Sequence, residues 1–268
     1  MSVPKIIHQI WIQGEQNLPE HLAKNKDKIK ELHPTWKYIL WDEISILQLL
    51  KKTNMEWYKN YYKFEYLHQK VDYAKLIILY LHGGICIDMD AYTIKKLDGL
   101  FFKFKDYDFI LSYASEFNSI INYILCNNTN RCMNNGIFFG KPNTDILSYM
   151  IKYISYECSK LQHKIYCISN TTGPIYFNKY INEYMKDNKN KSKIFILDND
   201  YVEPCVMDIC KETENTYIKH KHNMTWIDDY LRKIIELYLL HNRIFDTVFL
   251  LILLSLFLVL FYFILLIF

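Results

Sequence analysis

The sequence predicts an α/β domain with a mostly parallel central sheet and helices on both faces of that sheet. Short apolar, β-branched runs alternate with helical stretches along most of the chain, which is typical of sheets built from β-α-β units. One of these runs ends in two acidic residues, Asp88 and Asp90. Open α/β sheets hold their ligands where the strands end, so this acidic pair marks the predicted functional edge of the sheet.

In the first part of the chain, strands are predicted where apolar and aromatic residues gather, over residues 5–11, 36–41 and 85–87. Helices are predicted where apolar residues recur at helical spacing, over residues 19–32, 44–52, 57–68 and 71–82. Pro34 ends the first of these helices. Gly83 ends the last, because glycine suits the residue that follows a helix.

The alternation continues in the second part of the chain. Helices are predicted over residues 97–102, 144–159 and 171–185, and strands over residues 109–113, 137–140 and 194–197. A histidine-rich loop over residues 217–226 follows. No repeat or domain linker interrupts the pattern, so we expect one globular domain over residues 1–230.

The C-terminal residues 248–268 are apolar except for Ser255 and the semi-polar Tyr262. A helix of this length reaches roughly 30 Å, the thickness of the hydrocarbon core of a bilayer. The sequence therefore predicts a single-pass membrane anchor, preceded by a basic juxtamembrane segment over residues 231–247. The basic residues of that segment favour a cytosolic position for the globular part, and the lumenal orientation stays open.

Composition restricts the partners. The net charge is +3 with both signs spread along the chain, so we expect no nucleic acid partner. The seven cysteines show no C-x₂-C spacing. Free thiols in a reducing compartment are the default expectation, and one or two disulfides stay open.

The acidic pair indicates metal chemistry. Carboxylate oxygens are the ligands that Mg²⁺ and Mn²⁺ prefer, and such ions readily share the phosphates of a substrate. Asp88 and Asp90 therefore point to an enzyme that acts on a phosphorylated small molecule with a bound Mn²⁺ or Mg²⁺ ion.

Several segments together resemble a known family. The strand Pro4 to Trp11 reads P-K-I-I-H-Q-I-W, the segment from His33 to Trp41 reads H-P-T-W-K-Y-I-L-W, and residues 79–90 read L-Y-L-H-G-G-I-C-I-D-M-D. These segments are similar to glycosyltransferase family 32, which includes fungal Golgi mannosyltransferases and inositolphosphorylceramide mannosyltransferases. The resemblance extends over about residues 4–226. It implies a GT-A-like nucleotide-sugar-binding fold and makes residues 1–230 the catalytic domain.

The resemblance also implies an activity, the transfer of a hexose from a nucleotide-sugar donor to a glycan or lipid acceptor with retained configuration. Asp90 is expected to contact the metal directly, and Asp88 to reach hydroxyl groups of the donor. A cation held there stabilises the diphosphate leaving group as a Lewis acid. We expect a front-face displacement in which the leaving phosphate helps to deprotonate the acceptor.

Further residues are expected to bind the donor. Asp72 and Lys75 lie one helical turn apart where the family has Asp and Arg facing the sugar and ribose, and the lysine loses the bidentate geometry of the arginine. Trp11 is expected to stack on the base. The remaining predicted donor contacts are Gly84, Asn135 and Thr172.

Two histidines are candidates to complete the metal shell. The family carries a His-His pair near its end, and here Lys221 separates His220 from His222. Neutral imidazole is a competent metal ligand. The register is ambiguous, so both histidines stay candidates.

Two other functions stay open. A haloacid-dehalogenase-type phosphatase also has a strand ending in Asp-x-Asp, but Tyr92 stands where that motif has Thr or Val. A catalytically silent, membrane-anchored binding protein is the second alternative, because Lys75 and Lys221 depart from the family pattern.

Overall fold

The computed structural model describes residues 2–114, 131–154, 156, 158, 164–187, 191–206, 209–221 and 229–267. Within these ranges, the side chains of residues 206, 209, 231, 235–236, 239–240, 242–243 and 260–267 lie outside the description. The chain divides into two compact units. The first comprises Met1–Ser115 and Cys132–Trp226, and the second comprises Glu116–Arg131 and Ile227–Phe268.

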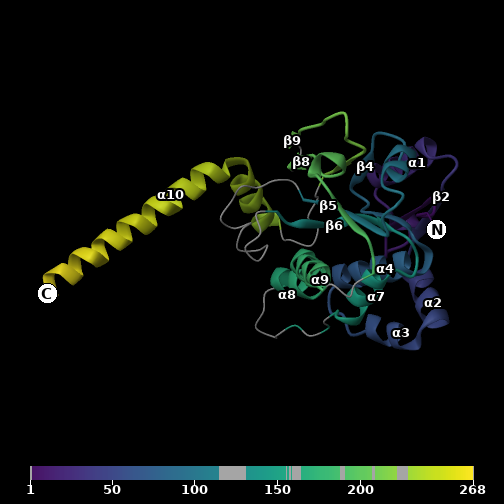
Figure 1. The fold of residues 1–268 in the computed structure, drawn as a ribbon, viewed down its shortest axis with the longest axis horizontal. Helices are drawn as coiled ribbons and strands as arrows, with labels where there is room; N and C mark the ends of the chain where they lie inside the picture. Colours follow the sequence, from purple (N-terminus) through teal and green to yellow (C-terminus); the bar gives the residue numbers. More distant parts are fainter. Residues whose placement is uncertain are drawn as a thin grey trace. The chain divides into compact units, whose positions relative to one another are not determined.

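A six-stranded sheet forms the centre of the first unit (Figure 1), with the strand order β2-β1-β3-β6-β5-β7. The bounds of its strands are β1 Ile6–Ile10, β2 Lys37–Trp41, β3 Gly84–Ile87, β5 Phe109–Tyr113, β6 Met133–Gly140 and β7 Ile194–Leu197. Strand β6 is antiparallel to both of its neighbours, whereas β1 is parallel to β2 and β3, and β5 is parallel to β7. The predicted mostly parallel α/β sheet is therefore confirmed, with one antiparallel strand inside it.

Both faces of the sheet are covered. Successive side chains along a strand point to opposite faces, so a strand that is apolar at consecutive positions has to be buried on both sides. In β3, Cys86 faces one core, and Ile85 and Ile87 face the other. The first core receives side chains from α2 Glu43–Thr53, α3 Met55–Tyr61, α4 Leu67–His82, α7 Asp145–Lys152 and α9 Pro174–Lys186. The second core receives side chains from α1 Glu20–Leu32 and α5 Asp98–Lys103. Figure 1 shows α4, α7 and α9 together on one side of the sheet and α1 on the other.

Two small antiparallel sheets were not predicted. One pairs β4 (Ala91–Thr93) with β10 (Ile218–His220), and the other pairs β8 (Cys205–Val206) with β9 (Ile209–Cys210). Strands of two or three residues are too short to show a period in the sequence. The first of these sheets brings the C-terminal part of the domain next to the acidic pair.

The structure pairs Cys158 with Cys167, and Cys205 with Cys210. The default expectation of free thiols is therefore wrong for these four cysteines. Cys86, in the middle of β3, is a free and buried thiol.

Helix boundaries differ from the prediction in several places. The helix predicted over residues 57–68 is α3 (Met55–Tyr61), and the helix predicted over residues 144–159 is the shorter α7 (Asp145–Lys152). Helix α4 begins at Leu67, so the predicted break before residue 71 is absent. The predicted helix over residues 171–185 begins instead at Pro174, after a separate helix α8 (Lys164–Thr171). Proline is favourable at a first helical position because its missing N–H has no helical partner there.

The second unit is described mainly by helix α10 (Asp229–Ile267), in which His241 has a non-helical conformation. The large apolar side chains from Val248 to Val259 are exposed. Counting only the residues with described side chains, no helix combines the length and apolarity needed to cross a bilayer. The predicted anchor over residues 248–268 extends into side chains outside the description and stays a prediction.

Candidate active site

The acidic pair stands in the turn that joins β3 to β4. Two side-chain amides donate hydrogen bonds to backbone carbonyls of this turn. Gln9 Nε2 donates to the carbonyl of Asp88 (3.1 Å), and Asn25 Nδ2 donates to the carbonyls of the two residues that flank Asp90 (3.0 and 2.8 Å). Hydrogen bonds from β1 and α1 thus fix the backbone that carries both carboxylates.

The small sheet brings His220 to this turn. Strand β10 runs antiparallel to β4, and the amide of Lys221 donates to the carbonyl of Asp90 (3.2 Å). His220 Nε2 lies 3.1 Å from Asp90 Oδ1 and 3.9 Å from Asp88 Oδ2. Of the two histidines predicted here, the structure brings His220 to the carboxylates, and His222 lies outside the described residues.

Asp88, Asp90 and His220 offer a donor set that fits a divalent cation. One ligand atom from each residue lies within 4.8 Å of the others. Carboxylate oxygens together with an imidazole nitrogen suit Mn²⁺ and related ions. The side chains of Asp88 and Asp90 are 28% and 17% exposed, whereas that of His220 is 6% exposed. A substrate therefore has access to the site from the side of the carboxylates.

A further carboxylate, unforeseen from the sequence, stands behind His220. Glu203 follows the short helix η2 (Asn199–Tyr201), and its side chain is fully buried. His220 Nδ1 lies 2.6 Å from Glu203 Oε1, and Asn134 Nδ2 donates to the same oxygen. The imidazole is thus held between Glu203 and Asp90, with one ring nitrogen facing each carboxylate.

Strand β6 passes so close to the site that position 136 has no room for a side chain. A Cβ atom on Gly136 would lie 2.6 Å from His220 Cε1 and 2.7 Å from Asp88 Oδ2. The strand predicted over residues 137–140 begins earlier in the structure, at Met133, so Gly136 lies within β6 and forms a wall of the site.

A buried ionic cluster adjoins Asp88. Lys75 Nζ lies 2.5 Å from Asp88 Oδ1 and 3.6 Å from Asp72 Oδ1. Thr172 Oγ1 donates to Asp72 Oδ2 (3.1 Å), and Asn135 Nδ2 donates to Asp72 Oδ1 (3.4 Å). Lys75 Nζ also donates to the carbonyl of Asn135 (3.4 Å). The structure thus gathers four of the predicted donor-binding residues into one network joined to Asp88.

Burial and neighbouring charges shift the pKa values of these groups. Burial raises the pKa of Asp72 to about 7, against the opposing effect of the Lys75 ammonium. Burial alone would lower the pKa of Lys75, but the carboxylates of Asp88 and Asp72 outweigh it and raise that pKa. For His220, Glu203 and Asp90 likewise outweigh burial and raise the pKa well above its ordinary value. The carboxylates of Asp88 and Asp72 therefore keep Lys75 positively charged beside Asp88.

Two other predicted donor residues lie apart from this network. The indole N–H of Trp11 donates to the carbonyl of Asn17 (3.3 Å), and the ring is partly exposed just beyond the end of β1. Gly84 begins β3, at the opposite end of that strand from Asp88. Its φ is +101°, in the region that favours glycine, and a Cβ atom there would lie 2.4 Å from the carbonyl oxygen of Ile6. A close backbone approach explains this glycine, and the structure does not bring it to the site.

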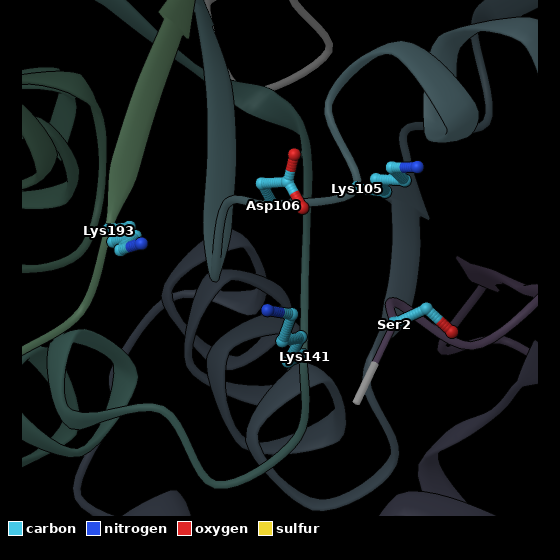
Figure 2. A pocket seen from close by; sticks show the side chains of 5 residues that line it. All are labelled: Ser2, Lys105, Asp106, Lys141 and Lys193. Atoms are coloured by element: carbon cyan, nitrogen blue, oxygen red, sulfur yellow. The ribbon is translucent and has the colours of Figure 1, made fainter.

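An open cavity of about 440 Å³ lies at the other edge of the sheet. Its lining residues are Ser2, Lys105, Asp106, Lys141 and Lys193 (Figure 2). These residues precede β1, β5 and β7 or follow the antiparallel β6, so they gather where the parallel strands begin. This cavity is therefore separate from the site around the acidic pair.

Comparison with known proteins identifies the family. A family model described as "Glycosyltransferase sugar-binding region containing DXD motif" matches residues 19–110. Uncharacterized glycosyltransferase L373 of Acanthamoeba polyphaga mimivirus is 31% identical over 232 residues, which cover 84% of each chain. The chain belongs to the DXD glycosyltransferases. The resemblance noted in the sequence is thereby confirmed, and the protein is an enzyme that transfers a sugar.

Two further similarities are more limited. Inositol phosphoceramide mannosyltransferase 1 of Schizosaccharomyces pombe is 31% identical over 106 residues, covering 38% of this chain and 32% of that protein. The matched segment thus spans about a third of the yeast glycosyltransferase. Mouse xyloside xylosyltransferase 1 has a TM-score of 0.50 at 11% identity, covering 83% of this chain and 99% of that one. This second similarity concerns the fold alone.

Membership in the DXD glycosyltransferases disfavours both alternatives. A phosphatase would require a different family, and Tyr92 already departs from its motif. The silent alternative rested partly on Lys75, yet this lysine keeps a buried positive charge 2.5 Å from Asp88. The replacement of arginine by lysine therefore preserves the charge at the site.

Proposed function

We propose that the protein is a metal-dependent, retaining glycosyltransferase that moves a hexose from a nucleotide-sugar donor to a glycan or lipid acceptor. The observation that carries this proposal is the convergence of Asp88, Asp90 and His220 within 4.8 Å, beside the buried Lys75. This arrangement combines a cation site with a positive side chain at the edge of an α/β sheet.

The residues at this edge have separable roles. A bound Mn²⁺ or Mg²⁺ ion would supply Lewis-acid stabilisation of the diphosphate leaving group. Asp90 and His220 would hold that ion, and Asp88 would contact both the ion and hydroxyl groups of the donor. Lys75 adds fixed positive charge where negative charge develops, which is more effective in a buried site than in water.

The network around Asp72 would bind the sugar and ribose of the donor. Asp72, Asn135 and Thr172 together offer a carboxylate, an amide and a hydroxyl group, which can accept from and donate to sugar hydroxyls. Trp11, at the end of β1, would stack on the base. Because no carboxylate is identified as a nucleophile, we propose front-face displacement, with the leaving phosphate taking the proton of the acceptor.

The relatives suggest which substrates to test first. The yeast protein is named as a mannosyltransferase that acts on inositol phosphoceramide. We therefore propose a nucleotide-linked mannose as the first donor and an inositol phosphate lipid as the first acceptor. Soluble glycans are the second class of acceptor.

A donor screen tests the proposal. The purified full chain in detergent is incubated with Mn²⁺ and a panel of nucleotide sugars, and released nucleotide is measured with and without acceptor. We expect release with one donor, abolition by EDTA, and a loss of at least about a hundredfold in Asp90→Asn. Asp27→Asn, an exposed residue of α1, is the matched control and should keep the parent rate. Equal rates in Asp90→Asn and the parent would refute the mechanism.

We also propose that residues 248–268 anchor the protein in a membrane, with the globular part in the cytosol. The apolar sequence and its basic flank support this orientation. The disulfides Cys158–Cys167 and Cys205–Cys210 favour an oxidising compartment instead. Protease digestion of sealed microsomes distinguishes a cytosolic globular part from one inside the oxidising compartment. Digestion of the globular part without detergent fits a cytosolic position, and protection until detergent is added refutes it.

A further inference from the structure

Glu203 is a fully buried carboxylate with no role in the mechanism proposed above. A buried carboxylate is unfavourable unless strong hydrogen-bond donors face it. The donors that face Glu203 Oε1 are His220 Nδ1, at 2.6 Å, and Asn134 Nδ2. The side chain therefore lies directly behind the imidazole whose other nitrogen faces Asp90.

The surroundings hold this carboxylate in place. The amide of Gly136 donates to Asn134 Oδ1, which fixes the orientation of the Asn134 amide toward Glu203. The backbone amide of Glu203 donates a hydrogen bond to the carbonyl of Asn199 (2.7 Å). The hairpin β8–β9, closed by the disulfide Cys205–Cys210, begins two residues further on. Glu203 is thus fixed from both sides along the chain.

We propose that Glu203 is a positioning residue that fixes His220 in the tautomer with its proton on Nδ1, so that the lone pair of Nε2 faces the metal. This inference rests on the proposed metal dependence. A ring nitrogen can bind a metal only through its lone pair, and a carboxylate on the other nitrogen sets the tautomer and the orientation of the ring. Asn134 holds the Glu203 carboxylate in this orientation, because its Nδ2 donates to the same oxygen, Oε1.

A metal-binding measurement on the full chain tests the proposal without relying on activity. Mn²⁺ affinity is measured by electron paramagnetic resonance for the parent and for Glu203→Gln, which keeps the size of the side chain but removes its charge. We expect the Mn²⁺ affinity to fall by about 10- to 100-fold. The control is Asp200→Asn, in the short helix η2 just before Glu203, because Asp200 accepts hydrogen bonds from Thr213 and Asn215 rather than from residues of the site. This control should bind Mn²⁺ like the parent.

A double substitution separates positioning from a general structural role. If Glu203 acts through His220, then Glu203→Gln should cause no further loss of Mn²⁺ affinity in a His220→Ala background. An equal further loss in that background would overturn the proposal. So would a Glu203→Gln protein that binds Mn²⁺ within twofold of the parent, or an Asp200→Asn protein that is weakened as much as Glu203→Gln.

A direct observation of the tautomer needs no substitution, so it decides the case even where Glu203→Gln does not fold. Nitrogen-15 spectra of the histidine side chains are recorded for the parent loaded with diamagnetic Mg²⁺. We expect a proton on His220 Nδ1 and none on Nε2, and a proton on Nε2 would overturn the proposal. A parent protein that binds neither Mn²⁺ nor Mg²⁺ would instead contradict the metal dependence on which the proposal rests.

Discussion

At the scale of single residues, the site is shaped as much by a missing side chain as by the charged groups around it. Gly136 leaves space that His220 and Asp88 occupy. The neighbouring Lys75 pairs with both Asp88 and Asp72, and its positive charge offsets the repulsion between these two carboxylates. Both features lead to predictions that can be measured on single substitutions.

Gly136→Ala should weaken Mn²⁺ binding by about tenfold or more. The new Cβ atom would have to push away either His220 or Asp88, and overpacking of this kind costs about 1–3 kcal/mol. The measurement is a Mn²⁺ titration of each purified protein. Gly99→Ala is the control, because its Cβ atom meets only the hydroxyl end of Tyr217 at 2.8 Å. Parent-like Mn²⁺ affinity in Gly136→Ala would contradict the described geometry of the site.

Lys75→Met should lower the free energy of unfolding by about 3–5 kcal/mol, because it leaves the carboxyl group of Asp72 and the partly exposed carboxylate of Asp88 without their counter-ion. Denaturant unfolding of the full chain measures this change. Lys70→Met, on the same helix, removes a longer ion pair with Glu43 (3.6 Å) and should cost no more than about 1 kcal/mol. A similar loss of stability in both variants would show that the Lys75 cluster has no special role.

At the scale of elements, strand ends and short sheets place the functional groups. The long strands and helices could be predicted, because their periodicity extends over many residues. The position of Asp88 and Asp90 at the end of β3 follows directly from that prediction. Glu203 and Asn25 could not be assigned, because they reach the site through the segment that follows the short helix η2 and through packing of α1, neither of which leaves a pattern in the sequence.

The junction of β1, β2 and α4 should make the protein sensitive to acid. His8 donates from Nε2 to the carbonyl of Gly83 (2.9 Å) and accepts from the indole N–H of Trp41 (3.1 Å). Burial lowers the pKa of His8 to about 4 from an ordinary value of 6.5. The unfolded chain therefore binds a proton between these pH values while the folded protein does not. His8 should thus contribute stability above pH 6.5 that is lost as the pH falls toward 4.

Unfolding curves recorded between pH 7 and pH 4 test this expectation. The parent should lose about 3 kcal/mol through His8 over this range. In His8→Gln, the fall in stability should be smaller by that amount, since the glutamine does not titrate. Parallel pH profiles for the two proteins would mean that His8 does not limit stability in acid.

At the scale of the whole molecule, an α/β domain covered on both faces of its sheet holds the residues proposed to bind the donor and the metal at one edge of that sheet. The fold class, the family and the position of the acidic pair could be predicted from the sequence. The sequence did not predict the antiparallel β6, which nevertheless carries Asn134, Asn135 and Gly136 to the site. Pairing between strands far apart in the chain is a tertiary property, so local patterns cannot specify it.

The most direct test of the central claim is the position of the metal. Crystals of the protein soaked with Mn²⁺ and a nucleoside diphosphate would show the ion in an anomalous difference map. The predicted result is one strong peak bonded to Asp90 and His220, adjacent to Asp88, and in contact with the diphosphate. A Mn²⁺ peak bound to the diphosphate but remote from these three side chains would contradict the account.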